Sequence, residues 1–207
     1  MAEIRVKTEL IKSELILGGQ KSGKSRRAEL LARDWLQQSP HHKAVLIATA
    51  QPWDEEMRQR IARHQRDRAE RVPGLTTVEE PLQLAQTIKR LSRPDTLLVV
   101  DCLTLWLTNL LMPIDVENTP NKPLNKTLAG NFIDYSAMLY VAILDSKQED
   151  KGPIVIVSNE IGLGVIPMGH EVRAFVDALG KLNQDVAHRC DTVTLMAAGL
   201  PLSLKSL

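Results

Sequence analysis

Residues 18–25, with the sequence GGQKSGKS, match the phosphate-binding pattern G-x-x-x-x-G-K-[ST] at every fixed position. In this pattern backbone N–H groups curl around phosphate oxygens, and the N-terminus of the following helix adds its positive dipole end. The Lys24 ammonium is expected to reach the β- and γ-phosphates, and the Ser25 hydroxyl to ligate Mg²⁺. Because an apolar run precedes the pattern and a helix-like stretch follows it, we predict a nucleotide-binding loop.

An acidic residue, Asp101, follows directly after the apolar run 97–100. A carboxylate at the tip of a buried strand is what a Walker B site requires, since it faces the Mg²⁺ of the bound nucleotide. The alternative is that Asp101 caps the helix that follows. We predict the metal-side role, which makes Ser25 and Asp101 the metal-binding pair.

A third group of candidates lies on a predicted helix over 55–68, where Arg60, His64 and Arg68 recur every four residues and share one face. Two guanidinium groups disfavour a nearby imidazolium and lower the pKa of the histidine. A neutral imidazole is a nucleophile that can accept a nucleotidyl group, and the arginines could hold the attacked phosphate. On spacing alone, a solvated basic helix face with an incidental histidine is the more common explanation.

Short apolar runs alternate with helix-like stretches along the chain. The runs are rich in Val, Ile and Leu without alternation, which is typical of strands buried on both faces, and they lie at 15–17, 44–47, 96–100, 154–157 and 192–196. The helix-like stretches lie at 24–38, 55–68, 82–91, 135–146 and 172–189. This order predicts an α/β fold with a mainly parallel sheet between two layers of helices. Ligands of such sheets bind beyond the carboxyl ends of the strands, so Asn159 and Glu160 are also expected near the site.

The 207-residue length indicates one domain, which we place at 15–207 after an N-terminal extension over 1–14. Residues 113–130 contain three prolines and little periodicity, which predicts a surface loop or insertion.

The composition and charge bear on whether the protein binds nucleic acid or a membrane. A formal net charge of +1 gives no strong field for nucleic acid or an anionic membrane, so we expect neither partner. Cys102 and Cys190 show no metal-ligand spacing and are expected to be buried, reduced thiols. No apolar run reaches the roughly 20 residues of a membrane span, and residues 1–14 lack the apolar core of a signal peptide. These features predict a cytoplasmic protein.

Eight blocks in order along the chain carry a family resemblance. They are 18–26, 47–50 (IATA), 54–64, 77–81 (TVEEP), 100–110 (VDCLTLWLTNL), 157–167 (VSNEIGLGVIP), 180–184 (GKLNQ) and 199–202 (GLPL). Together they resemble the bifunctional adenosylcobinamide kinase / adenosylcobinamide-phosphate guanylyltransferase family. Each block alone is modest evidence, but the ordered set is highly specific.

The resemblance implies an activity in assembly of the cobalamin nucleotide loop. Members phosphorylate the aminopropanol hydroxyl of adenosylcobinamide with ATP or GTP. They then transfer GMP from GTP to adenosylcobinamide phosphate, giving adenosyl-GDP-cobinamide and pyrophosphate. The transfer passes through a GMP–histidine, and the histidine of the family falls on His64, which with Lys24 is expected to be catalytic. The family also implies a RecA-like P-loop fold and a homotrimer.

The resemblance further implies which residues contact the nucleotide. They are Gly18, Gly19, Gln20, Lys21, Ser22, Gly23, Lys24, Ser25, Ala48, Thr49, Ala50, Gln65, Arg66, Asp67, Arg68, Glu79 and Asp101. Lys21 stands where the family usually has arginine, so charge is kept but the bidentate fork is lost. The spacing from His64 to Glu79 is also longer than usual in the family.

Two other functions agree with the same motifs. A P-loop kinase for a small metabolite would keep the phosphate loop and Asp101 but would not need His64. A nucleotide-dependent switch protein would hydrolyse slowly and order a surface segment, for which 113–130 is the candidate. A requirement of turnover for a cobinamide would separate these functions from the family activity.

Overall fold

The computed structural model describes residues 12–112 and 126–206. Its strands are β1 (Ser13–Gly18), β2 (Lys43–Ala48), β3 (Leu75–Glu79), β4 (Thr96–Asp101), β5 (Ile154–Val157), β6 (Thr192–Ala197) and β7 (Leu200–Lys205). Its helices are α1 (Lys24–Gln38), α2 (Glu55–Arg71), α3 (Leu84–Leu91), α4 (Leu103–Leu111), α5 (Lys126–Asp145) and α6 (His170–Arg189).

The strands form one sheet in the order β3-β2-β4-β5-β1-β6-β7. Every pairing is parallel except the last, in which β6 and β7 form an antiparallel hairpin. In register, Asp101 lies beside Ala48 of β2 and Val157 of β5, and Gly18 lies beside Met196 of β6. The carboxyl ends of these strands therefore meet at one edge of the sheet, as the sequence predicts.

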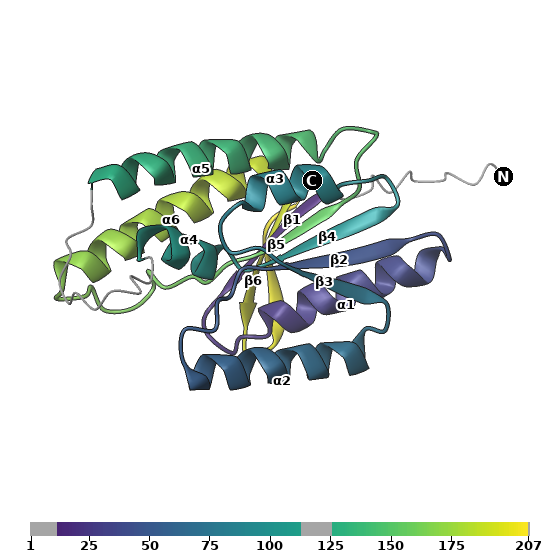
Figure 1. Cartoon of the computed structure of the whole chain (residues 1–207), viewed down its shortest axis with the longest axis horizontal. Helices are drawn as coiled ribbons and strands as arrows, with labels where there is room; N and C mark the ends of the chain where they lie inside the picture. Colours follow the sequence, from purple (N-terminus) through teal and green to yellow (C-terminus); the bar gives the residue numbers. More distant parts are fainter. Residues whose placement is uncertain (1–11, 113–125, 207) are drawn as a thin grey trace.

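Helices cover both faces of this sheet (Figure 1). Alternate residues of β4 show how the faces divide: Leu97 and Val99 pack into a core with α1, whereas Leu98 and Val100 pack into a core with α3, α4, α5 and α6. Helix α2 lies on the α1 side (Figure 1). The prediction of a three-layer α/β fold with a mainly parallel sheet is confirmed.

Three elements were not expected from the sequence. Strand β3 is an edge strand in which no residue is fully buried and only Leu75 and Val78 are half-buried, so it lacks a continuous apolar run. Strand β7 is exposed along its whole length and contains Pro201. Helix α4 follows β4 after the single residue Cys102, and its residues 103–111 were not among the predicted helix-like stretches.

Two segments that stood out in the sequence lie partly outside the described residues. Of the predicted insertion at 113–130, residues 126–130 belong to α5, and 113–125 are outside the described range. The boundary between 1–14 and 15–207 stays a prediction, since the description starts at residue 12 and β1 already begins at Ser13.

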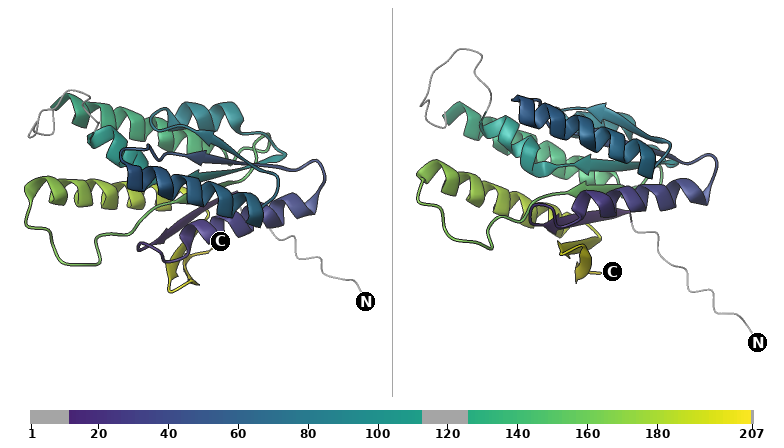
Figure 2. Two further views of the ribbon diagram at one scale, coloured as in Figure 1. Left: turned by 60° about the horizontal axis from the view of Figure 1, so that its bottom comes forward. Right: turned by 90° about the horizontal axis from the view of Figure 1, so that it is seen from below.

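Helices α5 and α6 pack against each other and extend beyond the sheet, and the chain between β5 and α6 runs outward alongside α6 (Figure 2). Within the described residues, no helix combines the length and the apolar character needed to cross a membrane.

Candidate functional site

The connection between β1 and α1 is built around two glycines with positive φ. Gly18 has φ 149°, and a Cβ there would lie 2.5 Å from the Met196 carbonyl oxygen and 2.6 Å from the Ser22 hydroxyl. Gly23, with φ 101°, precedes the first residue of α1. Any side chain at Gly18 would therefore collide with β6, and both positions need the freedom of glycine to make the tight turn.

The phosphate loop is held by one internal backbone hydrogen bond and by two more from neighbouring segments. The Ser22 N–H donates to the Gly19 carbonyl (3.3 Å) within the loop. The Glu160 N–H, after β5, donates to the Gly18 carbonyl (3.0 Å), and the Gly199 N–H, in the β6–β7 turn, donates to the Ser22 carbonyl (3.0 Å). Glu160 thus lies beside the loop, as its place after a strand predicts.

Lys24 opens α1 and is only 8% exposed. Its ammonium donates to the Gly19 carbonyl (2.6 Å) and to the Ser22 hydroxyl (3.5 Å), so it lies over the loop. Burial lowers the pKa of Lys24, while the nearby Asp101 carboxylate opposes that shift. A phosphate in the loop would meet this ammonium directly.

Asp101 is the half-buried last residue of β4. Its carbonyl accepts a hydrogen bond from the Thr49 N–H (3.1 Å), which ties the tip of β4 to the segment after β2. Burial lowers the pKa of both Lys24 and His64, and the negative charge of the Asp101 carboxylate partly offsets that lowering in each. The charge of Asp101 therefore acts on the phosphate loop and on α2 together. This is the position that a metal-side carboxylate requires.

Thr49 is fully buried and its hydroxyl is used within the protein. The hydroxyl donates to the Cys102 carbonyl (2.7 Å) and accepts from the Cys102 N–H (2.9 Å). The Thr49 carbonyl accepts from the Asn109 side-chain amide (2.8 Å), which also donates to the Pro81 carbonyl (3.0 Å). Asn109 was not among the sequence candidates, although a single amide within the apolar segment 103–111 was a visible signal.

His64 is half-buried on α2. Burial is the main cause that lowers the pKa of its imidazole below the ordinary value; Asp101 opposes the shift, and Arg60, Arg68 and Arg63 reinforce it. The sequence argument identified the arginines but not the larger effect of burial. The imidazole is therefore held in its neutral, nucleophilic form near neutral pH.

The residues after His64 divide into buried and exposed groups. The Arg68 guanidinium is buried: its Nη1 donates to the Thr77 hydroxyl (3.1 Å), and its Nε lies 3.8 Å from the Glu29 carboxylate. The exposed Gln65 amide donates to the Glu79 carboxylate at the end of β3 (3.4 Å). Arg66 and Asp67 are exposed.

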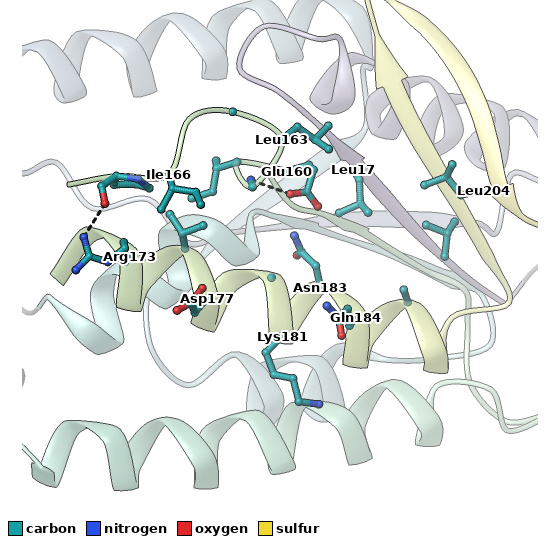
Figure 3. A pocket seen from close by; sticks show the side chains of 18 of the residues that line it. Leu17, Glu160, Leu163, Ile166, Arg173, Asp177, Lys181, Asn183, Gln184 and Leu204 are labelled. Atoms are coloured by element: carbon teal, nitrogen blue, oxygen red, sulfur yellow. Dashed lines mark hydrogen bonds between the residues drawn. The ribbon is translucent and has the colours of Figure 1, made fainter. Parts of the chain in front are cut away.

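Next to the phosphate loop lies a cavity of about 1200 Å³, between the loop after β5, helix α6 and the β6–β7 hairpin (Figure 3). Leu17, immediately before Gly18, lies at one end of it. Leu163 and Ile166 line it, and the Glu160 carboxylate accepts a hydrogen bond from the Gly162 N–H (2.9 Å) at its wall (Figure 3). The cavity is thus wide and partly apolar, and it lies next to the phosphate loop, since Leu17 and Glu160 line it.

Among the residues that the structure describes, no three His, Cys, Asp or Glu side chains gather as a metal cluster. Both cysteines are buried, and burial raises the pKa of the Cys102 thiol to about 11 and that of Cys190 to about 12. Both cysteines are free as well as buried, as the sequence predicts.

Comparison with known proteins identifies relatives across nearly the whole chain. The family model described as cobinamide kinase / cobinamide phosphate guanyltransferase matches residues 14–204. The bifunctional adenosylcobalamin biosynthesis protein CobP of Pseudomonas aeruginosa is 43% identical over 93% of this chain and 96% of its own length. The bifunctional adenosylcobalamin biosynthesis proteins CobU of Escherichia coli and Salmonella typhimurium are 31% and 32% identical, over 92% of this chain and 98% of theirs. Because the family model covers residues 14–204 and these relatives are aligned over more than nine-tenths of both chains, the chain belongs to the cobinamide kinase / cobinamide phosphate guanyltransferase family.

Proposed function

We propose that this chain phosphorylates adenosylcobinamide with ATP or GTP and then transfers GMP from GTP to adenosylcobinamide phosphate through a GMP–histidine at His64. The observation that carries the proposal is a half-buried histidine with a lowered pKa, in the field of the same Asp101 carboxylate that acts on Lys24. A small-metabolite kinase needs the phosphate loop and Asp101 but has no use for such a histidine.

In the guanylyl transfer, a neutral ring nitrogen of His64 attacks the α-phosphorus of GTP, and the bond to the pyrophosphate oxygen breaks. Lys24 and the loop N–H groups neutralise the charge that develops on the departing pyrophosphate. An oxygen of adenosylcobinamide phosphate then attacks the same phosphorus, and the P–N bond to His64 breaks. The histidine returns to its neutral form, and one difficult transfer becomes two easier ones.

In the kinase reaction, the same loop presents the γ-phosphate to the aminopropanol hydroxyl. Phosphoryl transfer depends mostly on orientation and charge stabilisation, which the loop and Lys24 supply. We propose that the bulky substrate occupies the cavity next to the loop, which Leu17 and Glu160 line.

The residues at the loop also fit a bound Mg²⁺. Ser25 in the first turn of α1 and Asp101 at the tip of β4 offer a hydroxyl and a carboxylate oxygen, the hard ligands that Mg²⁺ prefers alongside nucleotide phosphates. We propose that these two side chains hold the ion, which when bound would neutralise phosphate charge.

The nucleotide contacts are proposed in two groups. We propose that the residues of the loop contact the nucleotide together with Ala48 and Ala50 at and after the end of β2, Glu79 at the end of β3 and Gln65 on α2; Arg66 and Asp67 on exposed α2 are candidates for the same role. Thr49 and Arg68 are better explained as internal supports, because the hydroxyl of one and the guanidinium of the other already contact protein groups.

We further propose a cytoplasmic homotrimer with no nucleic-acid partner. Leu200, Leu202 and Leu204 of β7 are all more than half exposed, which supports an interface between copies of the chain. Light scattering should give the mass of a trimer, and Leu202→Glu should lower that mass. A monomeric wild type would reject this proposal.

A covalent labelling experiment tests the proposed function. The protein is incubated with Mg²⁺ and GTP labelled at the α-phosphate and then denatured, and His64→Ala is treated in parallel. Acid-labile, alkali-stable label on the wild type alone would identify a phosphoramidate at His64. If a wild type that binds GTP stays unlabelled, the GMP–histidine is rejected, and phosphoryl transfer without label would favour the simple kinase.

A further inference from the structure

Helix α2 carries His64 but has little of the apolar contact that usually fixes a helix. Arg68 is its only buried residue, whereas five residues of α1 are buried. Surface helices are ordinarily held by an apolar stripe facing the core. The position of α2, and therefore of His64, must depend largely on polar contacts.

The main polar contact is an ionic anchor formed by Glu29, Arg68 and Arg71. Glu29, on α1, is 3% exposed, and its carboxylate lies 3.8 Å from the Arg68 Nε and 3.3 Å from the Arg71 Nε. Burial raises the pKa of Glu29, and the two arginines oppose that rise. On its other side, Arg68 donates to the Thr77 hydroxyl of β3 (3.1 Å), so groups from two elements hold it.

The anchor is linked to His64 by helix geometry. Arg68 follows His64 by four residues, so the two side chains lie one turn apart on the same face of α2. A rotation or slide of α2 that breaks the contact of Arg68 with Glu29 would move His64 as well. The phosphate loop is different, because its hydrogen bonds run to residues after β5 and β6 and not to α2.

We propose that Glu29 is a positioning residue for the guanylyl transfer: through Arg68 it fixes α2 and holds His64 at the α-phosphate of GTP. The inference rests on the proposed function of His64. It separates the two activities, because only the guanylyl transfer uses His64 as a nucleophile, whereas phosphoryl transfer to the cobinamide hydroxyl needs no reacting group on α2.

The test measures both activities in Glu29→Gln, which keeps the size of the side chain and removes its charge. The rate constant for labelling His64 at saturating α-labelled GTP should fall on the order of a hundredfold, the usual effect of misplacing a reacting group by an ångström. GTP affinity and the phosphorylation of adenosylcobinamide by γ-labelled GTP should stay within about threefold of wild type, since neither needs a placed nucleophile. In a double-mutant cycle, Glu29→Gln with Arg68→Gln should lose no more labelling than either single variant, because the pair acts as one unit.

Glu14→Gln is the matched control. Glu14 is 5% exposed and paired with Arg27 of α1 (2.8 Å), and its carboxylate accepts a hydrogen bond from the Thr194 hydroxyl of β6. Among the described residues, none of its hydrogen bonds or ion pairs runs to α2. This variant should lose stability yet keep the wild-type ratio of labelling to phosphorylation. If Glu29→Gln does not fold, Thr77→Val is the second variant, since it removes only the hydroxyl that accepts a hydrogen bond from Arg68. It should lower the rate of labelling but not that of phosphorylation, by a smaller factor than is expected for Glu29→Gln.

Three results would overturn the inference. Labelling of Glu29→Gln at the wild-type rate would show that the anchor does not position His64. Equal losses of labelling and phosphorylation, shared by Glu14→Gln, would reduce Glu29 to a residue that only stabilises the fold. An unlabelled wild type would instead reject the proposed function, and this inference with it, which distinguishes the two failures.

Discussion

The phosphate loop and helix α2 lie at the same edge of the sheet but are supported in opposite ways. The loop begins on a strand between two neighbours, and its carbonyls accept hydrogen bonds from residues after β5 and β6. Helix α2 is attached by a few charged and polar side chains. The difference follows the proposed chemistry, because both reactions need fixed phosphates whereas only the guanylyl transfer needs the histidine.

The largest effect should come from removing the shared group. Lys24→Ala is expected to lower kcat of both reactions on the order of a hundredfold to a thousandfold, because the ammonium neutralises charge on the departing group in each. Steady-state assays of phosphorylation and GMP transfer measure this. Guanylyl transfer that survives in Lys24→Ala would show that the two reactions do not share the loop.

A second change tests how rigidly the loop is built. Gly18→Ala places a Cβ 2.5 Å from the Met196 carbonyl oxygen at a φ of 149°. It should lower the free energy of unfolding by about 1–3 kcal/mol and weaken GTP binding. Urea unfolding and GTP titration are the measurements. Gly180→Ala in α6 is the control, since a Cβ there meets nothing within 4 Å, and it should stabilise the protein by about 0.5–1 kcal/mol.

The smallest effect concerns the charge around His64. Labelling should rise with pH as the imidazole loses its proton, with a midpoint below the ordinary histidine pKa of about 6.5. Arg60→Ala removes a positive charge that disfavours the imidazolium, so the pKa of His64 should rise and the midpoint should move to higher pH. The rate of labelling at several pH values measures this shift.

Arg58→Ala controls for changing α2 itself, because Arg58 is paired with Glu55 on the same helix (3.0 Å). In Arg58→Ala, the midpoint of the pH dependence of labelling should match that of the wild type. An unchanged midpoint in Arg60→Ala would mean that the charge of Arg60 does not contribute to the lowered pKa of His64.

The strands that were predicted from the sequence are those whose burial requires a continuous run of apolar residues. Parallel strands with neighbours on both sides need apolar residues on both faces, which is why β1, β2, β4, β5 and β6 were found. The edge strands β3 and β7 have no such need, and their pairing depends on distant residues. The family and its enzyme class were also predicted from ordered motifs and are confirmed by the comparisons.

Within the site, sequence reasoning identified the side chains that we propose act on the nucleotide. It was less successful with side chains that hold other residues in place. Lys24 and Asp101 lie in patterns of a few consecutive residues, and the structure brings them to one edge. The roles of Thr49 and Arg68 depend on partners such as Cys102 and Glu29, 53 and 39 positions away in the sequence. Glu29 left one faint signal, an acid beside the buried alanines of α1.

Strand β1 and the phosphate loop are made early during translation, but their neighbours in the sheet are made late. β1 pairs with β5 and β6, and the Gly199 N–H that holds the loop is supplied near the end of the described chain. Almost the whole domain must therefore leave the ribosome before the Gly199 N–H can donate its hydrogen bond to the loop. Nascent chains stalled before residue 190 should bind nucleotide weakly, and affinity should appear abruptly as the β6–β7 hairpin emerges.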